Sequence, residues 1–371
     1  MSVPLFTASV LFLAQQLDWS PPPGVDWETD FLTARAKAIE LEVPIVATTL
    51  SPGRLHFVNN GGEVFGGPDW PKISEEAVWF HYGSSWGNSE TALRNRRFEY
   101  RFDITSAPDT QVIDPFSLRS NEAEFNEFTG LRDHVLSCVL RTGELVPLDK
   151  FKEWDALAES LQKQEKRYRK GQILEFAEHP DRAVSYLALE RMSRKFEDEF
   201  EELVPDLLAI NHGPTLILTF DFLMRKDCKK ENAIRSALEE WFMSWRKSAN
   251  PNPLLRRATW CIGKYGDKGS RRCIEQALDQ DKFSGAVGSA AAEATEQLFE
   301  RRKLSKKEAQ MLLAMGFPAL PEPAPIEVSP DLMMTAQALH EALSKITKKR
   351  VRFPEQYTSE SRLKLIDAWS P

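Results

Sequence analysis

The residues best suited to chemistry are the aromatic and polar side chains crowded between positions 79 and 87, in the run Trp-Phe-His-Tyr-Gly-Ser-Ser-Trp-Gly. Aromatic rings bind apolar ligand groups, and histidine and serine can orient polar ones, so this composition is typical of a ligand pocket. The candidate ligand-binding residues are Trp79, His81, Tyr82, Ser85 and Trp86. The same residue types also serve in a core or a packed loop, and that alternative stays open.

The segment from Gly83 to Gly87 also matches the letters G-x-S-x-G, with Ser85 in the position of a nucleophile. A nucleophile elbow needs a strand before the serine and a helix after it. Residues Asn88 to Arg97 do not have the pattern of a good helix, so the sequence does not predict serine hydrolase chemistry. We assign no catalytic residue.

Metal and thiol chemistry have little support in the sequence. The six histidines are scattered, and neither they nor the glycine pairs at 61–62 and 66–67 form a metal or phosphate motif, so no metal and no cofactor is predicted. Cys261 and Cys273 lie on consecutive predicted helices and are a candidate disulfide. The alternative is that they, Cys138 and Cys228 are all small buried thiols.

The composition excludes some classes of partner. The chain has 371 residues, which predicts two or three packed units rather than one core. Its net charge of -7 disfavours binding to nucleic acid. No apolar run reaches the roughly 20 residues of a membrane-spanning helix, so no integral membrane segment is expected.

The first 16 residues are the candidate for an export signal. Val3 to Ala14 is apolar, which suits a secretory signal peptide and predicts a periplasmic or extracellular protein. The segment has no lysine or arginine before the apolar run. The alternative is a buried N-terminal segment of a cytoplasmic protein.

Residues 17–149 mix helix and strand signals. Asp26 to Glu42 is amphipathic, with Asp26 as N-cap, and Pro44 to Leu50 is a short β-branched run that predicts a buried strand. Phe98 to Ile104 alternates apolar and polar residues, and Thr110 to Asp114 follows a proline, so both are predicted as strands. These elements predict an α/β domain.

This order of elements resembles the thioredoxin-like fold, in which a helix leads into a central strand and a later strand follows a cis-proline. The segment from Ser106 to Asp114 is similar to the family's proline-led strand and implies that Pro108 is the cis residue. Where the family has its CxxC motif, this chain has Ser51-Pro-Gly-Arg54. Dithiol exchange needs two thiols on that turn, so the resemblance implies a non-catalytic relative.

The rest of the chain is predicted to be helical. Residues 150–178 read as a connector helix, and 179–316 as helix pairs whose starts are 34, 39 and 29 residues apart. These pairs resemble short HEAT-like repeats, which implies an α-solenoid; a non-repetitive helical bundle is the alternative. Residues 317–330 carry five prolines and are predicted as a linker, and 331–371 as a helical tail.

These observations favour a non-catalytic interaction or scaffold protein with a protein partner. The alternatives are a thiol-redox accessory protein acting through Cys138, or a small-ligand-binding protein using the residues between 79 and 87.

Overall fold

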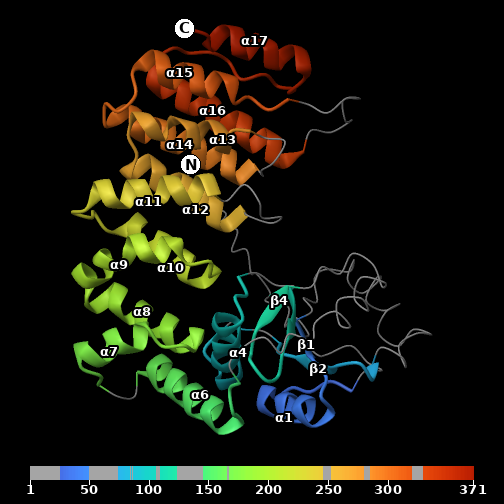
Figure 1. Cartoon of the computed structure of the whole chain (residues 1–371). Helices are drawn as coiled ribbons and strands as arrows, with labels where there is room; N and C mark the ends of the chain where they lie inside the picture. Colours follow the sequence, from blue (N-terminus) through green and yellow to red (C-terminus); the bar gives the residue numbers. More distant parts are fainter. Residues whose placement is uncertain are drawn as a thin grey trace, which may run out of the picture. The chain divides into compact units, whose positions relative to one another are not determined.

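A computed structural model describes residues 26–49, 74–83, 85, 87–105, 109–122, 145–164, 167–244, 252–279, 285–319 and 329–371 (Figure 1). The chain divides into two compact units, Met1–Ala188 and Leu189–Pro371. The predicted export signal, Trp86, Pro108 and Cys138 lie outside the described residues. No helix in the described ranges has the length and apolar character needed to cross a bilayer.

The first unit contains a mixed sheet with strand order β2-β1-β3-β4. Its strands are β1 (Ile45–Thr49), β2 (Val78–His81), β3 (Asp109–Ile113) and β4 (Ser120–Glu122). β1 runs parallel to β2 and antiparallel to β3, and β4 is antiparallel to β3. The predicted strands at Pro44–Leu50 and Thr110–Asp114 are therefore confirmed.

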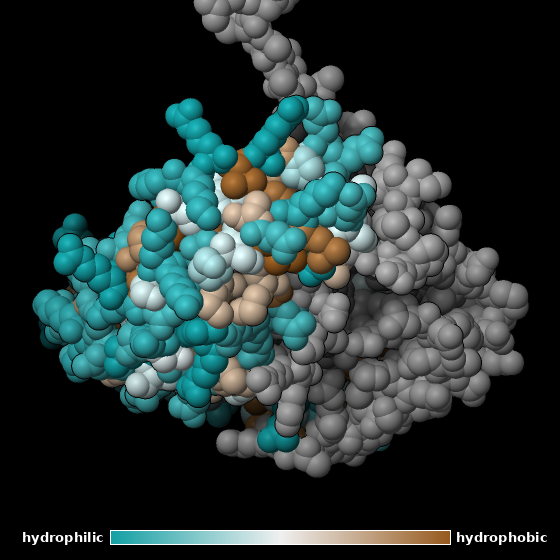
Figure 2. Space-filling view, turned by 90° about the horizontal axis from the view of Figure 1, so that it is seen from above, coloured by the Kyte–Doolittle hydropathy of each residue, from teal (hydrophilic) through white to brown (hydrophobic). Residues whose placement is uncertain are grey.

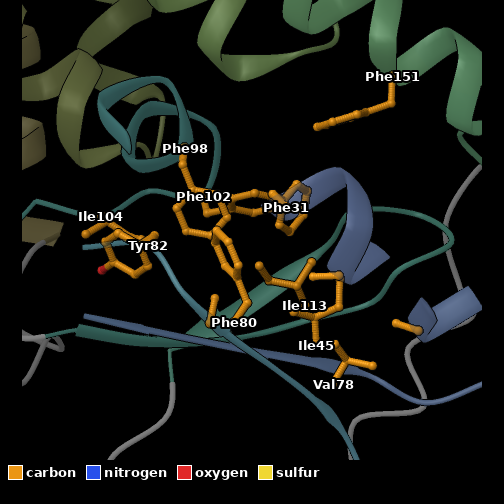
Figure 3. Close-up of a cluster of buried hydrophobic side chains, with 13 residues drawn as sticks. Phe31, Ile45, Val78, Phe80, Tyr82, Phe98, Phe102, Ile104, Ile113 and Phe151 are labelled. Atoms are coloured by element: carbon orange, nitrogen blue, oxygen red, sulfur yellow. The ribbon is translucent and has the colours of Figure 1, made fainter. Parts of the chain in front are cut away.

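Helices α1 (Phe31–Leu41) and α4 (Glu90–Arg101) share an aromatic core with one face of this sheet. Figure 3 shows Phe31, Phe80, Phe98 and Phe102 pointing toward one another between the helices and the strands. The ring of Phe31 lies 5.2 to 5.4 Å from each of the other three rings, between centroids. Burial of such large apolar surfaces is the main source of stability for a domain of this size.

Two predictions for this unit are wrong. α1 begins at Phe31 and not near Asp26, because the carboxylate of Asp30 accepts the backbone N–H of Thr33 at 2.9 Å and caps the helix there. The predicted strand at Phe98–Ile104 belongs mostly to α4, which Ser89 caps in the same way. Phe98 and Phe102 are four residues apart, so both face the core from the end of this helix.

The predicted connector is two helices, α6 (Leu148–Lys163) and α7 (Lys170–Ala177). Phe151 of α6 is fully buried in the aromatic core cluster. α6 is therefore part of the first unit and does not simply span a gap between domains. α8 (Arg182–Lys195) follows.

The second unit is built of helices that pack in two rows. One row is α10 (Gly213–Arg225), α12 (Asn252–Tyr265), α14 (Gly285–Glu300) and α16 (Pro330–Thr347), each packed on the next. The other holds α9 (Glu197–Ala209), α11 (Glu231–Ser244) and α13 (Arg271–Ala277), and α15 (Lys306–Met315) and α17 (Ser359–Trp369) follow (Figure 1). Consecutive helices thus alternate between rows.

The predicted helical tail is an integral part of this packing. α16 contacts both α14 and α15, and the indole of Trp369 in α17 is fully buried. The amide of Gln310 donates to the carbonyl oxygen of Trp369 and holds α17 on α15. Phe317, at the start of the predicted linker, is also buried, so that end of the linker belongs to the core.

Candidate functional site

The sheet separates the candidate ligand-binding residues. Trp79 and His81 project from one face of β2, where the ring of Trp27 contacts both, at 6.1 and 5.9 Å between centroids. Tyr82 joins Phe80 in the aromatic core on the opposite face. Because side chains alternate along a strand, Trp79 and His81 do not line one pocket with Tyr82.

His81 is the most unusual of these side chains. It is only 4% exposed, and its Nε2 atom has no hydrogen-bond partner among the described residues. Burial lowers the pKa of the imidazole to about 4, so His81 is neutral at ordinary pH. It lies beside aromatic rings and is suited to packing rather than to proton transfer.

Ser85 does not lie on a nucleophile elbow. The expectation that no helix follows it is wrong, because α4 begins at Glu90. However, Ser85 lies four residues beyond the end of β2 at His81 and five before Glu90. An elbow holds its serine on the sharp turn itself, so the G-x-S-x-G letters have no matching geometry here.

A buried ionic cluster, which the sequence analysis missed, lies between α4, α6 and the start of α8. Arg101 donates from Nε to Oδ2 of Asp181 at 2.6 Å and from Nη2 to Oδ1 of Asp155 at 3.2 Å. Arg97 reaches Asp155 and Glu159. The detectable signal was complementary spacing: two arginines four apart in one helix, and two acids four apart in another.

The opposite charges in this cluster stabilise the ionised forms of its side chains. Burial alone would raise the pKa of Asp155, but the charges of Arg101 and Arg97 outweigh burial and hold that pKa below its ordinary value. Asp181 also accepts the N–H of Val184 at 3.1 Å and so caps α8. The Arg101 guanidinium lies 4.6 Å from the ring centroid of Phe151. Both arginines pair with carboxylates on other helices, so the cluster is suited to joining helices.

A recurring cation stabilises helix ends in the second unit. Arg225 donates to the carbonyl oxygen of Ser193 at 2.6 Å, and Lys264 to those of Leu223 and Lys226 at 3.1 and 2.8 Å. Arg301 does the same for Gly263 at 3.3 Å. Each cation satisfies carbonyls near the negative end of the helix two before its own in the chain, which is α8, α10 and α12 in turn.

The described cysteines are buried and free, so the candidate disulfide between Cys261 and Cys273 is not formed, in line with the alternative of small buried thiols. The Sγ atom of Cys261 lies 3.8 Å from the carbonyl oxygen of Phe220, on α10. Burial raises the pKa of the Cys261 and Cys228 thiols and raises that of Cys273 to about 12. These thiols are poor nucleophiles.

A cleft of about 290 Å³ opens at the ends of α13 and α15. Its apolar lining includes Leu278, Leu312, Met315 and Phe317, and Arg362 of α17 forms part of its wall. Gly316 also lines the cleft, and a Cβ atom there would lie 2.8 Å from Cδ2 of Leu278, so a side chain at this position would crowd the lining. We refer to it as the α15 cleft.

The described part of the chain contains no group of three or more histidine, cysteine, aspartate or glutamate side chains that could hold a metal ion. No known family model matches the sequence, and comparisons with curated proteins and with solved structures find no match.

Proposed function

We propose that this chain is a non-catalytic scaffold protein, in which an α-solenoid of HEAT-like helix pairs presents a surface to a protein partner. One observation carries the proposal: α10, α12, α14 and α16 stack in one row, and cations at the ends of α10, α12 and α14 reach back to α8, α10 and α12. Solenoids of this kind build extended binding surfaces because each pair packs only on its neighbours.

The spacing of those cations supports the repeat. Lys264 follows Arg225 by 39 residues, and Arg301 follows Lys264 by 37 residues. These intervals are close to the repeat lengths of HEAT and armadillo proteins, about 40–47 residues. A non-repetitive helical bundle is not expected to show the same cation-to-carbonyl contact at nearly equal intervals along the chain.

We further propose that the first unit contains a thioredoxin-like domain that has lost dithiol chemistry. Support comes from the parallel pair β1 and β2 and the antiparallel β3 and β4, because that fold also joins a parallel pair to an antiparallel hairpin. The sequence after β1 carries Ser51-Pro-Gly-Arg54 in place of two cysteines. That sequence offers no thiol as a nucleophile for dithiol exchange.

The test of the scaffold is partner capture with the full chain. Tagged protein is cross-linked in extract from its native source, and cross-linked peptides are identified by mass spectrometry. We expect a stoichiometric partner cross-linked to lysines of the second unit, such as Lys268, Lys303 and Lys307. Recovery of the chain alone after cross-linking would overturn the proposal.

Two variants make that experiment specific. Gly263→Ala disturbs the packing of α12 on α14, because its Cβ atom would lie 2.6 Å from Cα of Ala294, and should weaken capture. In Gly171→Ala the new Cβ atom has no atom within 4 Å, so this variant should leave capture unchanged.

A disulfide-reduction assay tests the redox alternative. Wild type and Cys138→Ala should both leave the reduction of the disulfide substrate at its uncatalysed rate. Activity lost in Cys138→Ala would instead establish a thiol-redox protein.

A further inference from the structure

The α15 cleft leaves apolar side-chain surface exposed to solvent instead of burying it between helices. Met315, which lines the cleft, is 59% exposed. Figure 2 views the molecule from above, from the end where Figure 1 labels α15 and α17, and shows apolar patches among hydrophilic side chains. Contiguous exposed apolar surface rimmed by polar side chains is typical of interaction sites and ligand grooves.

The acidic side chains that line the cleft interact with other residues of the chain, whereas the basic one forms no ion pair with the described residues. On the α13 wall, Glu275 is paired with Arg271 at 2.7 Å, and Asp279 also has an interaction within the chain. On the α17 wall, Arg362 donates from Nε to the carbonyl oxygen of Phe317 at 2.9 Å and forms no ion pair with any described residue. The Nε contact fixes the guanidinium at the wall and leaves its terminal nitrogens for an acceptor.

We propose that the α15 cleft binds a short segment of the partner protein in which a bulky apolar side chain stands next to a carboxylate. The apolar group would fill the cleft, and the carboxylate would pair with the terminal nitrogens of Arg362, which suit two-point recognition of a carboxylate. A cavity of about 290 Å³ is close to the lower limit of ligand pockets and admits one large side chain. Met315 can adjust to its shape, because methionine is flexible and polarisable.

This inference rests on the proposed scaffold function and names the chemistry of its partner. The carboxylate could be an Asp or Glu side chain or the C-terminus of the partner. Both would make the same ion pair, so the experiment includes an arm for each.

The test uses the full chain and fluorescent peptides of about six residues, with affinity measured by fluorescence anisotropy. One peptide ends in leucine with a free carboxylate, a second is its C-terminal amide, and a third carries an internal Glu-Leu pair with an amide end. A fourth replaces that glutamate by glutamine. We expect the first or third peptide to bind, and its neutral counterpart to bind roughly tenfold or more weakly.

Variants then locate the binding site. Arg362→Met should weaken binding of the preferred peptide to the level of its neutral counterpart, and Arg362→Lys should retain part of the affinity. Met315→Asp introduces repulsion at an exposed position where folding is tolerant, and should abolish binding. The matched control is Lys364→Met, because Lys364 is exposed, lies on the same helix and is already paired with Glu360 at 2.6 Å.

Equal binding to wild type, Arg362→Met and Met315→Asp would overturn the inference, as would equal binding of charged and neutral peptides. Binding only after residues 320–328 are replaced by a Gly-Ser segment would also overturn it, because the chain itself would then supply the ligand. If Arg362→Met still captures the partner from extract, the inference fails while the scaffold function stands. If peptides bind but wild type captures no partner, the scaffold function fails instead.

Discussion

The Nε atom of Arg101 lies 2.6 Å from Oδ2 of Asp181, in an ion pair whose side chains are both almost completely buried. The pair joins α4, which packs on the sheet, to the capped start of α8. Arg101 is 80 residues from Asp181 in the sequence. The α/β core and the first helices after it are therefore stabilised together.

Removing one partner of this pair should be strongly destabilising. Asp181→Ala leaves the Arg101 charge buried without its main counter-ion, which typically costs about 3–5 kcal/mol of unfolding free energy. Urea denaturation followed by circular dichroism measures the loss. The control is Asp149→Ala, whose pair with Lys152 is largely exposed and should change stability by about 1 kcal/mol or less.

A double variant distinguishes a paired charge from simple packing. Arg101→Met with Asp181→Leu removes both charges, so it should be less destabilised than Asp181→Ala alone. If the double variant instead loses as much unfolding free energy as Arg101→Met and Asp181→Leu lose separately, added together, the ion pair is not the cause of the destabilisation.

His81 should make folding stability depend on pH. Its folded pKa is about 4, and the ordinary value is 6.5, so the unfolded chain binds the proton more readily. The contribution of neutral His81 is complete above about pH 6.5 and is lost as pH falls toward 4, by about 3 kcal/mol in total. His81→Gln should lose less stability over that range in denaturation at each pH. Parallel curves for wild type and variant would contradict this assignment.

Gly263 should be intolerant of a side chain. In Gly263→Ala the new methyl group would lie 2.6 Å from the backbone of Ala294, so α12 and α14 must separate. Overpacking of this kind costs about 1–3 kcal/mol. Thermal unfolding compares it with Gly171→Ala, which meets no atom within 4 Å and should be neutral or slightly stabilising.

The buried thiols should resist alkylation in the folded protein. Burial raises the pKa of Cys228, Cys261 and Cys273, so little thiolate is present even near the ordinary thiol pKa of about 8.5. Brief iodoacetamide treatment followed by peptide mass spectrometry should find these three residues unmodified, and fully modified after denaturation in guanidinium. A peptide linked through Cys261 and Cys273 in the unreduced sample would contradict the free state.

Local sequence signals were reliable where a segment's own residues decide its structure. The β-branched run at Ile45–Thr49 forms a strand, and the proline and turn signals marked the helix pairs from α8 onward. They failed where local signals competed. The alternation from Phe98 to Ile104 indicated a strand, but the cap at Ser89 and the aromatic core favour a helix in which Phe98 and Phe102 share one face.

The sequence by itself determined that helices follow the strand-containing part of the chain, that no CxxC motif follows the first strand, and the charge balance. Only the tertiary structure decided which residues act together. It put Trp79 and Tyr82 on opposite faces of one sheet, turned Cys261 toward α10, and brought Arg362 to the wall of a cleft lined by Leu278 and Met315. The physical reason is that side-chain partners depend on how separate elements pack, whereas propensity and capping act only within a few residues.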